Sequence, residues 1–408
     1  MYQETIPWVV NYDTNEIPPY ALPELLKCED GTDVTTSEQW LAKRRPELLQ
    51  RFREVMYGED LPLPAHVSYE LLDETPKALG GIATRRQVRL VFRQDDGREH
   101  TAIMLLYIPA DLPAPAPVFV GLTFGGNHVV SEEPDVFLTG LIGSGTGHFP
   151  EMYQKRGCHS RRFPLDYILG RGYAVAVCSY NDFFPDRPNG WQGSALSLFL
   201  SREELASAPE NYTCIGVWSW GLSRMLDCLE GMPDIDAERA VCFGHSRLGK
   251  TSLWTGVRDE RFKLACVNDS GCGGAALSRR LYGETLFSMT NVNAMGYWFL
   301  RSLKEKALHP ENLPIDQHEL IALMAPRCVA VHSATLDQWA DPTSEYLSAY
   351  HAGPAFRLFG MQPLATDTPP APDTAVGTDV SYFLRTGKHD ILKSDWKQYL
   401  DAADRIFR

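Results

Sequence analysis

The stretch AVCFGHSRLGK, residues 240–250, decides how the rest of the chain is interpreted. Its first four residues are small or apolar, as in a buried strand, and Gly244, Ser246 and Gly249 then precede a helix-like run. This pattern predicts a nucleophile elbow, a sharp strand-to-helix turn that exposes the hydroxyl of Ser246 near the free N–H groups of the helix. Because the spacing is G-x-S-x-x-G and not G-x-S-x-G, an ordinary turn whose serine caps the helix stays open as the alternative.

Strands and helices alternate along most of the chain. Apolar runs predict buried strands at 118–122, 173–179, 240–243, 262–267, 328–332 and 381–384. Amphipathic spacing predicts helices at 37–57, 215–229, 316–324 and 394–407. An alternating pair at 86–92 and 101–108, with a turn at Asp96 and Gly97, predicts an antiparallel hairpin. The expected fold is an α/β-hydrolase three-layer sandwich with a mostly parallel central sheet and N-terminal antiparallel strands.

No second domain boundary is evident, so residues 1–408 are predicted to form a single α/β-hydrolase domain. Residues 1–64, which are rich in proline and charge, are expected to be an N-terminal extension packed on that domain. The irregular stretches 129–165 and 180–211 are longer than ordinary connections. We therefore interpret both as insertions near the mouth of the active site.

Charge, hydropathy and cysteine usage argue against several classes of protein. Thirty-nine basic against 52 acidic residues give a net charge of -13, which argues against nucleic acid or an anionic membrane as partner. The sequence contains no apolar run of about 18 residues, the length that a membrane-spanning helix needs. The nine cysteines show neither metal-ligand spacing nor a disulfide framework. We therefore expect these cysteines to be reduced and to lie in the core. Without a recognisable signal peptide, a cytoplasmic location is expected if the chain is complete, and a secreted or periplasmic one if a signal was removed.

A serine nucleophile needs a histidine to take its proton and an acid to orient that histidine, in the chain order Ser, acid, His. His389 lies in a loop between the last strand and the last helix, where this base is expected. Two acids at strand ends compete for the third role, Asp337 and Asp269, and either could instead cap a turn or helix. His245 is expected to point away from Ser246 and to be structural.

The motifs GHSRLGK (244–250), NDSGCGGAA (268–276), DQW (337–339) and TGKH (386–389) together resemble carbohydrate esterase family 15, the glucuronoyl esterases. The resemblance runs from about residue 35 to the C-terminus and is closest to the bacterial branch. It implies a serine esterase that needs no cofactor and no metal. The implied substrates are glucuronoxylan or lignin–carbohydrate esters, cleaved between 4-O-methyl-glucuronic acid and a lignin alcohol.

The resemblance also implies roles for individual residues. Ser246 matches the nucleophile, His389 the general base, and Arg247 the arginine that supports the oxyanion. Asp337 matches an acid that some bacterial members use and is our first choice. Asp269 falls where many members carry a glutamate, and its shorter side chain puts its reach in doubt.

Three further positions match residues that hold sugar hydroxyls in this family: Lys250, Glu284 and Trp339. Lys250 lies one helical turn beyond Ser246, so both can face the same cleft. Without the resemblance these three would be interpreted as a surface lysine, a helix residue and a core aromatic. Two alternatives to a glucuronoyl esterase remain at this point: an acetylxylan or other carbohydrate esterase, and an inactive sugar-binding relative.

Overall fold

A computed structural model describes residues 9–140, 153–292 and 295–408. Its central feature is a ten-stranded sheet with the order β1-β2-β3-β5-β4-β6-β7-β8-β10-β9. The strands are β1 (His66–Ala78), β2 (Ala83–Arg93), β3 (Glu99–Pro109), β4 (Ala116–Thr123), β5 (Ala174–Ser179), β6 (Ile235–His245), β7 (Phe262–Asn268), β8 (Cys328–Ala334), β9 (Ala375–Val376) and β10 (Val380–Arg385). The six strands from β5 to β10 in this order pair in parallel, and β1, β2, β3 and β9 pair antiparallel at the two edges.

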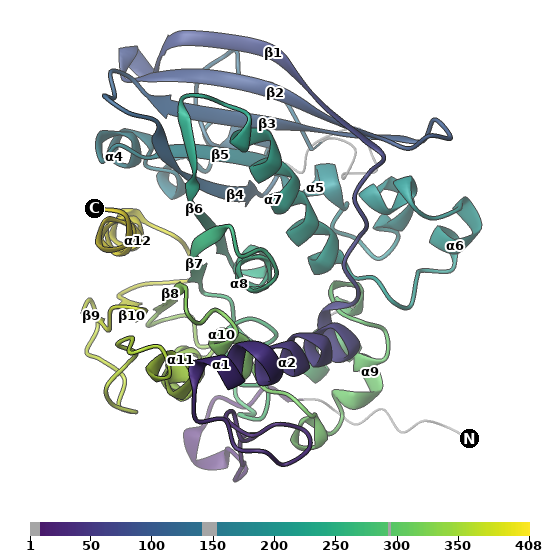
Figure 1. The fold of residues 1–408 in the computed structure, drawn as a ribbon, viewed down its shortest axis with the longest axis vertical. Coiled ribbons are helices and arrows are strands. Elements are labelled where there is room, and N and C mark those ends of the chain that lie inside the picture. Colours follow the sequence, from purple (N-terminus) through teal and green to yellow (C-terminus); the bar gives the residue numbers. More distant parts are fainter. Residues whose placement is uncertain (1–8, 141–152, 293–294) are drawn as a thin grey trace.

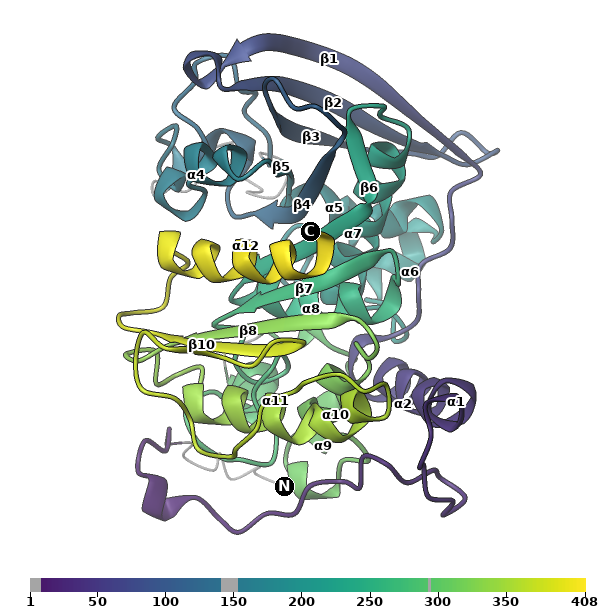
Figure 2. The ribbon, with the colours of Figure 1, turned by 60° about the vertical axis from the view of Figure 1, so that its left-hand side comes forward.

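Helices cover both faces of the sheet, as Figures 1 and 2 show. The longer ones are α2 (Arg45–Phe52), α7 (Cys214–Glu230), α8 (Arg247–Arg258), α11 (Pro342–Arg357) and α12 (Lys393–Phe407). The shorter ones are α1 (Ser37–Gln39), α4 (Leu165–Gly170), α5 (Tyr180–Phe183), α6 (Arg202–Ala206), α9 (Leu303–Lys306) and α10 (Gln317–Ala322). One hydrophobic cluster joins the sheet to α2, α7, α8, α10 and α11, and a second joins the opposite face to α4 and α12. The sheet therefore separates two cores, which confirms the predicted α/β-hydrolase sandwich.

The predicted elements recur with shifts of a few residues at their ends. The hairpin is confirmed as β2 and β3, with Arg89 opposite Ile103. The helix expected at 37–57 is continuous, although two of its turns, η2 (Trp40–Arg44) and η3 (Arg53–Tyr57), are π-helical. Strand β1 was not predicted, because its side chains are mostly exposed and it lacks the alternation of a half-buried strand.

The carboxyl ends of the parallel strands meet at one edge of the sheet, where sites in such folds are built. The stretch expected as an insertion at 129–165 is partly outside the described residues, at 141–152. Its described part reaches this edge, since Arg162 Nε donates to Asp390 Oδ1 at 2.7 Å, next to His389.

The expected core location of the cysteines is confirmed: all nine are free and eight are buried. Among the described residues, no helix combines the length and the apolar character needed to cross a membrane.

Candidate active site

Ser246 occupies the junction between β6 and α8 in a strained conformation. Its φ is 59° and its ψ is −130°, a combination that costs a non-glycine residue about 1–3 kcal/mol. A Cβ atom on Gly244 would lie 1.9 Å from the carbonyl oxygen of Leu248, so the turn requires glycine there. The Ser246 side chain makes no capping bond to α8, so the alternative of a simple helix cap is wrong. This geometry is that of a nucleophile elbow.

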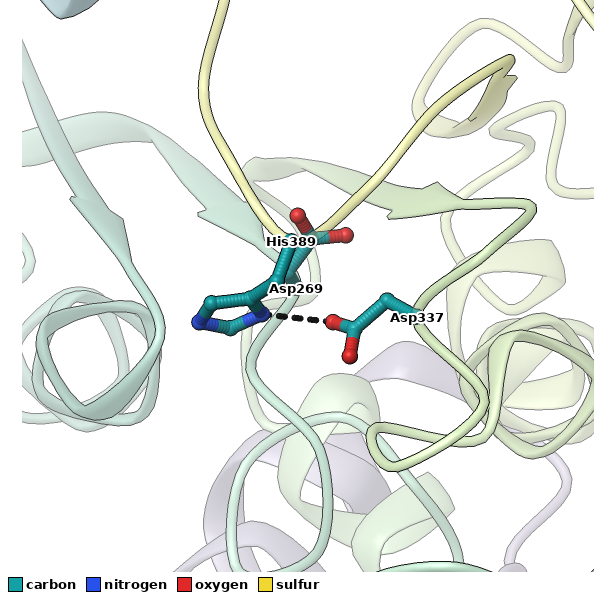
Figure 3. Close-up of side chains that lie close together, drawn as sticks. All are labelled: Asp269, Asp337 and His389. Carbon is teal, nitrogen blue, oxygen red and sulfur yellow. Dashed lines mark hydrogen bonds and ion pairs between the residues drawn. The ribbon is translucent and has the colours of Figure 1, made fainter.

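His389 and Asp337 meet beside the elbow. The Nδ1 atom of His389 lies 2.6 Å from Oδ2 of Asp337, and Figure 3 shows this contact. The Asp337 side chain is only 6% exposed, whereas that of His389 is 41% exposed. A buried carboxylate on Nδ1 holds the proton on that nitrogen, so Nε2 is the atom left to accept a proton.

His245, which precedes Ser246 in the chain, packs on the ring of His389. Its ring centroid lies 4.4 Å from that of His389, and its Nδ1 contacts Asn268 Oδ1 at 2.6 Å. Burial lowers the pKa of His245 well below its ordinary value, which keeps the ring neutral. The His245 side chain lies against His389 and not in a hydrogen bond with the serine, so its role is to support the base through packing.

Asp269 also lies close to the histidine, as Figure 3 shows, but its hydrogen bonds go elsewhere. Its Oδ2 accepts from the backbone N–H of Asp390 at 3.1 Å and from Arg385 at 3.5 Å. Burial raises the pKa of Asp269 well above its ordinary value, and the nearby carboxylates of Asp337 and Glu345 raise it further. Burial and the two carboxylates therefore favour the neutral form of Asp269, beside an acid that contacts His389 directly.

Arg247, directly after the serine, is fixed in place by a network of aromatic and acidic side chains. Its guanidinium forms an ion pair with Asp186 and lies 4.6 Å from the ring centroid of Trp298. The other carboxylate oxygen of Asp186 accepts from Tyr297 Oη at 2.7 Å and from Trp298 Nε1 at 2.8 Å. Asp186 is only 4% exposed and belongs to the 180–211 insertion. Because it pairs with the residue that follows Ser246, this insertion reaches the elbow.

The side chains predicted to hold sugar hydroxyls form one cluster. Lys250 Nζ donates to Glu284 Oε2 at 2.9 Å and to the carbonyl oxygens of Ser270 and Cys272 at 2.5 and 2.7 Å. Trp339 Nε1 donates to Glu284 Oε1 at 3.2 Å. The ammonium group thus has three acceptors for its three protons and a side chain that is 3% exposed. Lys250 orients Glu284, and a ligand hydroxyl would have to replace one of these bonds to contact it.

The comparisons with known proteins cover nearly the whole chain. A family model described as fungal glucuronyl esterase matches residues 205–360. The carbohydrate esterase MZ0003, from an unknown prokaryotic organism, is 38% identical over 97% of this chain and 91% of its own length. The structure of a glucuronoyl esterase from Solibacter usitatus is 36% identical, covers 97% of this chain and 100% of its own, and has a TM-score of 0.88. A promiscuous esterase of carbohydrate esterase family 15 from a marine bacterial metagenome is 36% identical, covers 97% and 99%, and has a TM-score of 0.85.

The chain belongs to carbohydrate esterase family 15. This membership confirms the resemblance and makes the chain a carboxylic ester hydrolase with the α/β-hydrolase fold. The roles of individual residues stay predictions, since similarity over the whole chain does not test them.

Two supporting residues of this esterase were not found from the sequence. Asp186 lies in an irregular loop that has no motif. The sequence predicted that this loop lies near the active site, but it did not single out Asp186. Glu345, on α11, accepts from the backbone N–H groups of Ser270 and Gly271 at 2.8 and 2.9 Å and from Ser333 Oγ at 2.6 Å. Burial raises the pKa of Glu345 to about 7. It ties the end of β8 to the loop after β7.

One group of metal-ligating side chains occurs among the residues that the structure describes: Asp269, Asp337 and His389, whose donor atoms lie within 4.8 Å of one another. An ion between the histidine nitrogen and the Asp337 oxygen would hold these two atoms roughly 3.3 Å apart, given bonds of about 2.0 Å and tetrahedral angles. The 2.6 Å separation is instead that of a hydrogen bond. The donor set of this family 15 esterase fits a triad better than a metal site.

Proposed function

We propose that this family 15 esterase hydrolyses esters of glucuronic acid, including its 4-O-methyl form, through an acyl-enzyme on Ser246. The contact between His389 and Asp337 beside a strained serine carries the esterase part of the proposal. The glucuronate part rests on the similarity to a solved glucuronoyl esterase at 36% identity over 97% of the chain. The natural substrates would be the ester links between glucuronoxylan and lignin alcohols.

The first half-reaction uses the serine as nucleophile. His389 Nε2 takes the proton of the Ser246 hydroxyl while the oxygen attacks the ester carbonyl. The Asp337 carboxylate stabilises the resulting imidazolium through Nδ1. The protonated histidine then gives its proton to the leaving alcohol, which departs and leaves the uronyl group esterified to Ser246.

In the second half-reaction, water replaces the alcohol. His389 deprotonates the water, which attacks the uronyl ester, and the serine leaves with the proton that the histidine returns. In both halves the tetrahedral oxyanion forms near Arg247 and the N-terminus of α8. The fixed guanidinium and the positive end of the α8 dipole supply the opposing charge.

The choice of substrate is tested with three esters: benzyl glucuronate, acetylated xylan, and benzyl acetate as the matched control that keeps the alcohol and lacks the sugar acid. We expect kcat/KM for benzyl glucuronate to exceed that for benzyl acetate by at least about 100-fold, because the Glu284 carboxylate can accept from sugar hydroxyls and the Trp339 ring can pack on a sugar face. Benzyl acetate has no group that uses either. Steady-state release of benzyl alcohol measures both. Turnover of acetyl esters alone would overturn the uronate proposal in favour of an acetylxylan esterase.

Asp186 provides a test of how the oxyanion is stabilised. We expect Asp186→Ala to lower kcat by about 10–100-fold with a smaller change in KM, because Arg247 loses the carboxylate that holds it at the elbow. Steady-state kinetics on benzyl glucuronate measures the effect.

A double-mutant cycle gives this prediction its control. In an Arg247→Ala background, Asp186→Ala should lower kcat little further, since its effect acts through Arg247. Asp227→Ala, which removes a partly buried ion pair with Arg261 at the end of α7, should leave kcat unchanged. Equal losses from Asp186→Ala in both backgrounds would mean that Asp186 acts only on the stability of the loop.

A further inference from the structure

Tyr12 is an exposed aromatic side chain held against the loops of the proposed sugar site. It lies in the N-terminal segment just before η1 (Thr14–Glu16), and 52% of its surface is exposed. Its ring meets the ring of Tyr282 edge to face, with centroids 5.8 Å apart and an interplanar angle of 88°. In Figure 2 this dark purple segment reaches the side of the sheet at which β10 ends.

The backbone beside Tyr12 is tied to the stretch that leads into Glu284. The carbonyl oxygen of Asn11 accepts from the N–H of Gly283 at 2.9 Å, and Asn11 Nδ2 donates to the carbonyl oxygen of Leu281 at 3.0 Å. These two bonds, one from the backbone and one from a side chain, tie Asn11 to residues 281–283. The position of Tyr12 is therefore set by the same loop that sets the position of Glu284.

Tyr282, which supports the Tyr12 ring, is itself anchored to the loop of Trp339. Its hydroxyl donates to Gln338 Oε1 at 2.6 Å, and the guanidinium of Arg280 lies 5.1 Å from its ring centroid. Arg280 in turn forms an ion pair with Asp341.

Gly283 shows how closely the two loops pack. It has a φ of +57°, and a Cβ atom there would lie 2.5 and 2.6 Å from the carbonyl oxygens of Gln338 and Trp339. The N–H of Glu284 also donates to the Trp339 carbonyl oxygen at 2.6 Å. The loops that carry Glu284, Trp339 and Tyr282 are thus packed on one another. Tyr282 is only 7% exposed, so Tyr12 and Gln338 are the exposed side chains at the outer end of this arrangement.

We propose that Tyr12 is the platform of a second sugar subsite, which binds a neutral pyranose ring of the glycan that carries the glucuronate. An exposed tyrosine ring offers a rigid apolar face to the C–H face of a sugar, at little cost in conformational entropy. Gln338, which binds the Tyr282 hydroxyl through Oε1 and the Thr335 carbonyl oxygen through Nε2, is exposed. Its amide keeps a second lone pair and a second N–H for sugar hydroxyls. This inference rests on the proposed function, since it extends the site around Glu284 and Trp339 outward by one sugar.

Two substrates separate this subsite from the catalytic site. One is benzyl glucuronate, and the other is the benzyl ester of an acidic xylo-oligosaccharide, in which the same glucuronate is attached to a short xylose chain. For Tyr12→Ala we expect kcat/KM on the xylo-oligosaccharide ester to fall about threefold to tenfold, and kcat/KM on benzyl glucuronate to stay unchanged. Tyr12→Phe, which keeps the ring, should behave as the wild type. Leu63→Ala, at a residue that is 70% exposed, serves as the control for loss of surface apolar area.

The outcomes that overturn the inference are distinct from those that overturn the proposed function. An equal loss on both substrates would assign Tyr12 to the alcohol side or to loop stability, and no loss on either would exclude a subsite there. Binding of the unesterified acidic xylo-oligosaccharide to Ser246→Ala, measured by titration calorimetry, should weaken by the same factor when Tyr12→Ala is added. If the wild type cleaves neither ester, the proposed function fails, whereas unchanged binding in the calorimetry overturns the subsite alone.

Discussion

Replacement of Ser246 by alanine is expected to reduce kcat on benzyl glucuronate by about 10⁴–10⁶-fold, since loss of the nucleophile removes the acyl-enzyme route. The elbow should persist, because alanine has the same Cβ atom as serine and the Ser246 hydroxyl caps no helix. Thermal unfolding and far-UV circular dichroism should therefore match those of the wild type. The kinetic assay is release of benzyl alcohol.

The matched control is Ser252→Ala, on the same helix. Ser252 is buried and donates to the carbonyl oxygen of Cys266 at 3.1 Å, away from the elbow, so its loss should leave kcat nearly unchanged. Residual activity of Ser246→Ala near the wild-type level would place the chemistry elsewhere. Absence of activity in both the wild type and the variant would favour an inactive sugar-binding relative.

The second large effect is expected from Asp337→Asn, with a loss in kcat of about 10²–10⁴-fold. The amide would donate its N–H to Nδ1 of His389 and so leave the proton on Nε2, the nitrogen that must accept the serine proton. Asp269→Asn should cost less than about tenfold, because burial raises the pKa of Asp269 and an asparagine resembles its neutral form. Steady-state kinetics on benzyl glucuronate compares the two variants directly.

The stability of Asp269→Asn provides an independent check on the charge of this group. A carboxyl whose folded pKa is raised contributes its full stability below the ordinary value of 3.8 and loses it as pH rises through the folded value. The wild type should therefore lose stability relative to Asp269→Asn as pH rises from about 4. A larger kinetic loss from Asp269→Asn than from Asp337→Asn would reverse the two roles.

The sheet and the elbow could be predicted because their determinants are local. The strand preceding Ser246 is a short apolar run, and the glycine that its turn requires is next to the serine in the chain. His389 and Asp337 could be proposed from their places after late strands, since parallel strands bring such loops to one edge. Their direct contact could not, because Asp269 ends a neighbouring strand and competes for the same position.

The supporting groups could not be predicted, because they depend on contacts between distant loops. Asp186 comes from a loop without periodicity and meets Arg247, 61 residues further along the chain. Lys250 is buried because the loop after β7 turns two carbonyl oxygens toward its ammonium group. No spacing in the sequence indicates that this loop would do so. Strand β1 was missed for a related reason: its pairing with β2, and not its own pattern, makes it a strand.

The most direct test of the proposed mechanism is rapid-quench mass spectrometry of the esterase with benzyl glucuronate. We expect a uronyl group on the tryptic peptide 240–247, attached to Ser246, and no adduct in Ser246→Ala. A burst of benzyl alcohol equal to the enzyme concentration should accompany the adduct where acylation is the faster half-reaction. An adduct on another residue, or turnover of the ester by Ser246→Ala at the wild-type rate, would contradict the proposed mechanism.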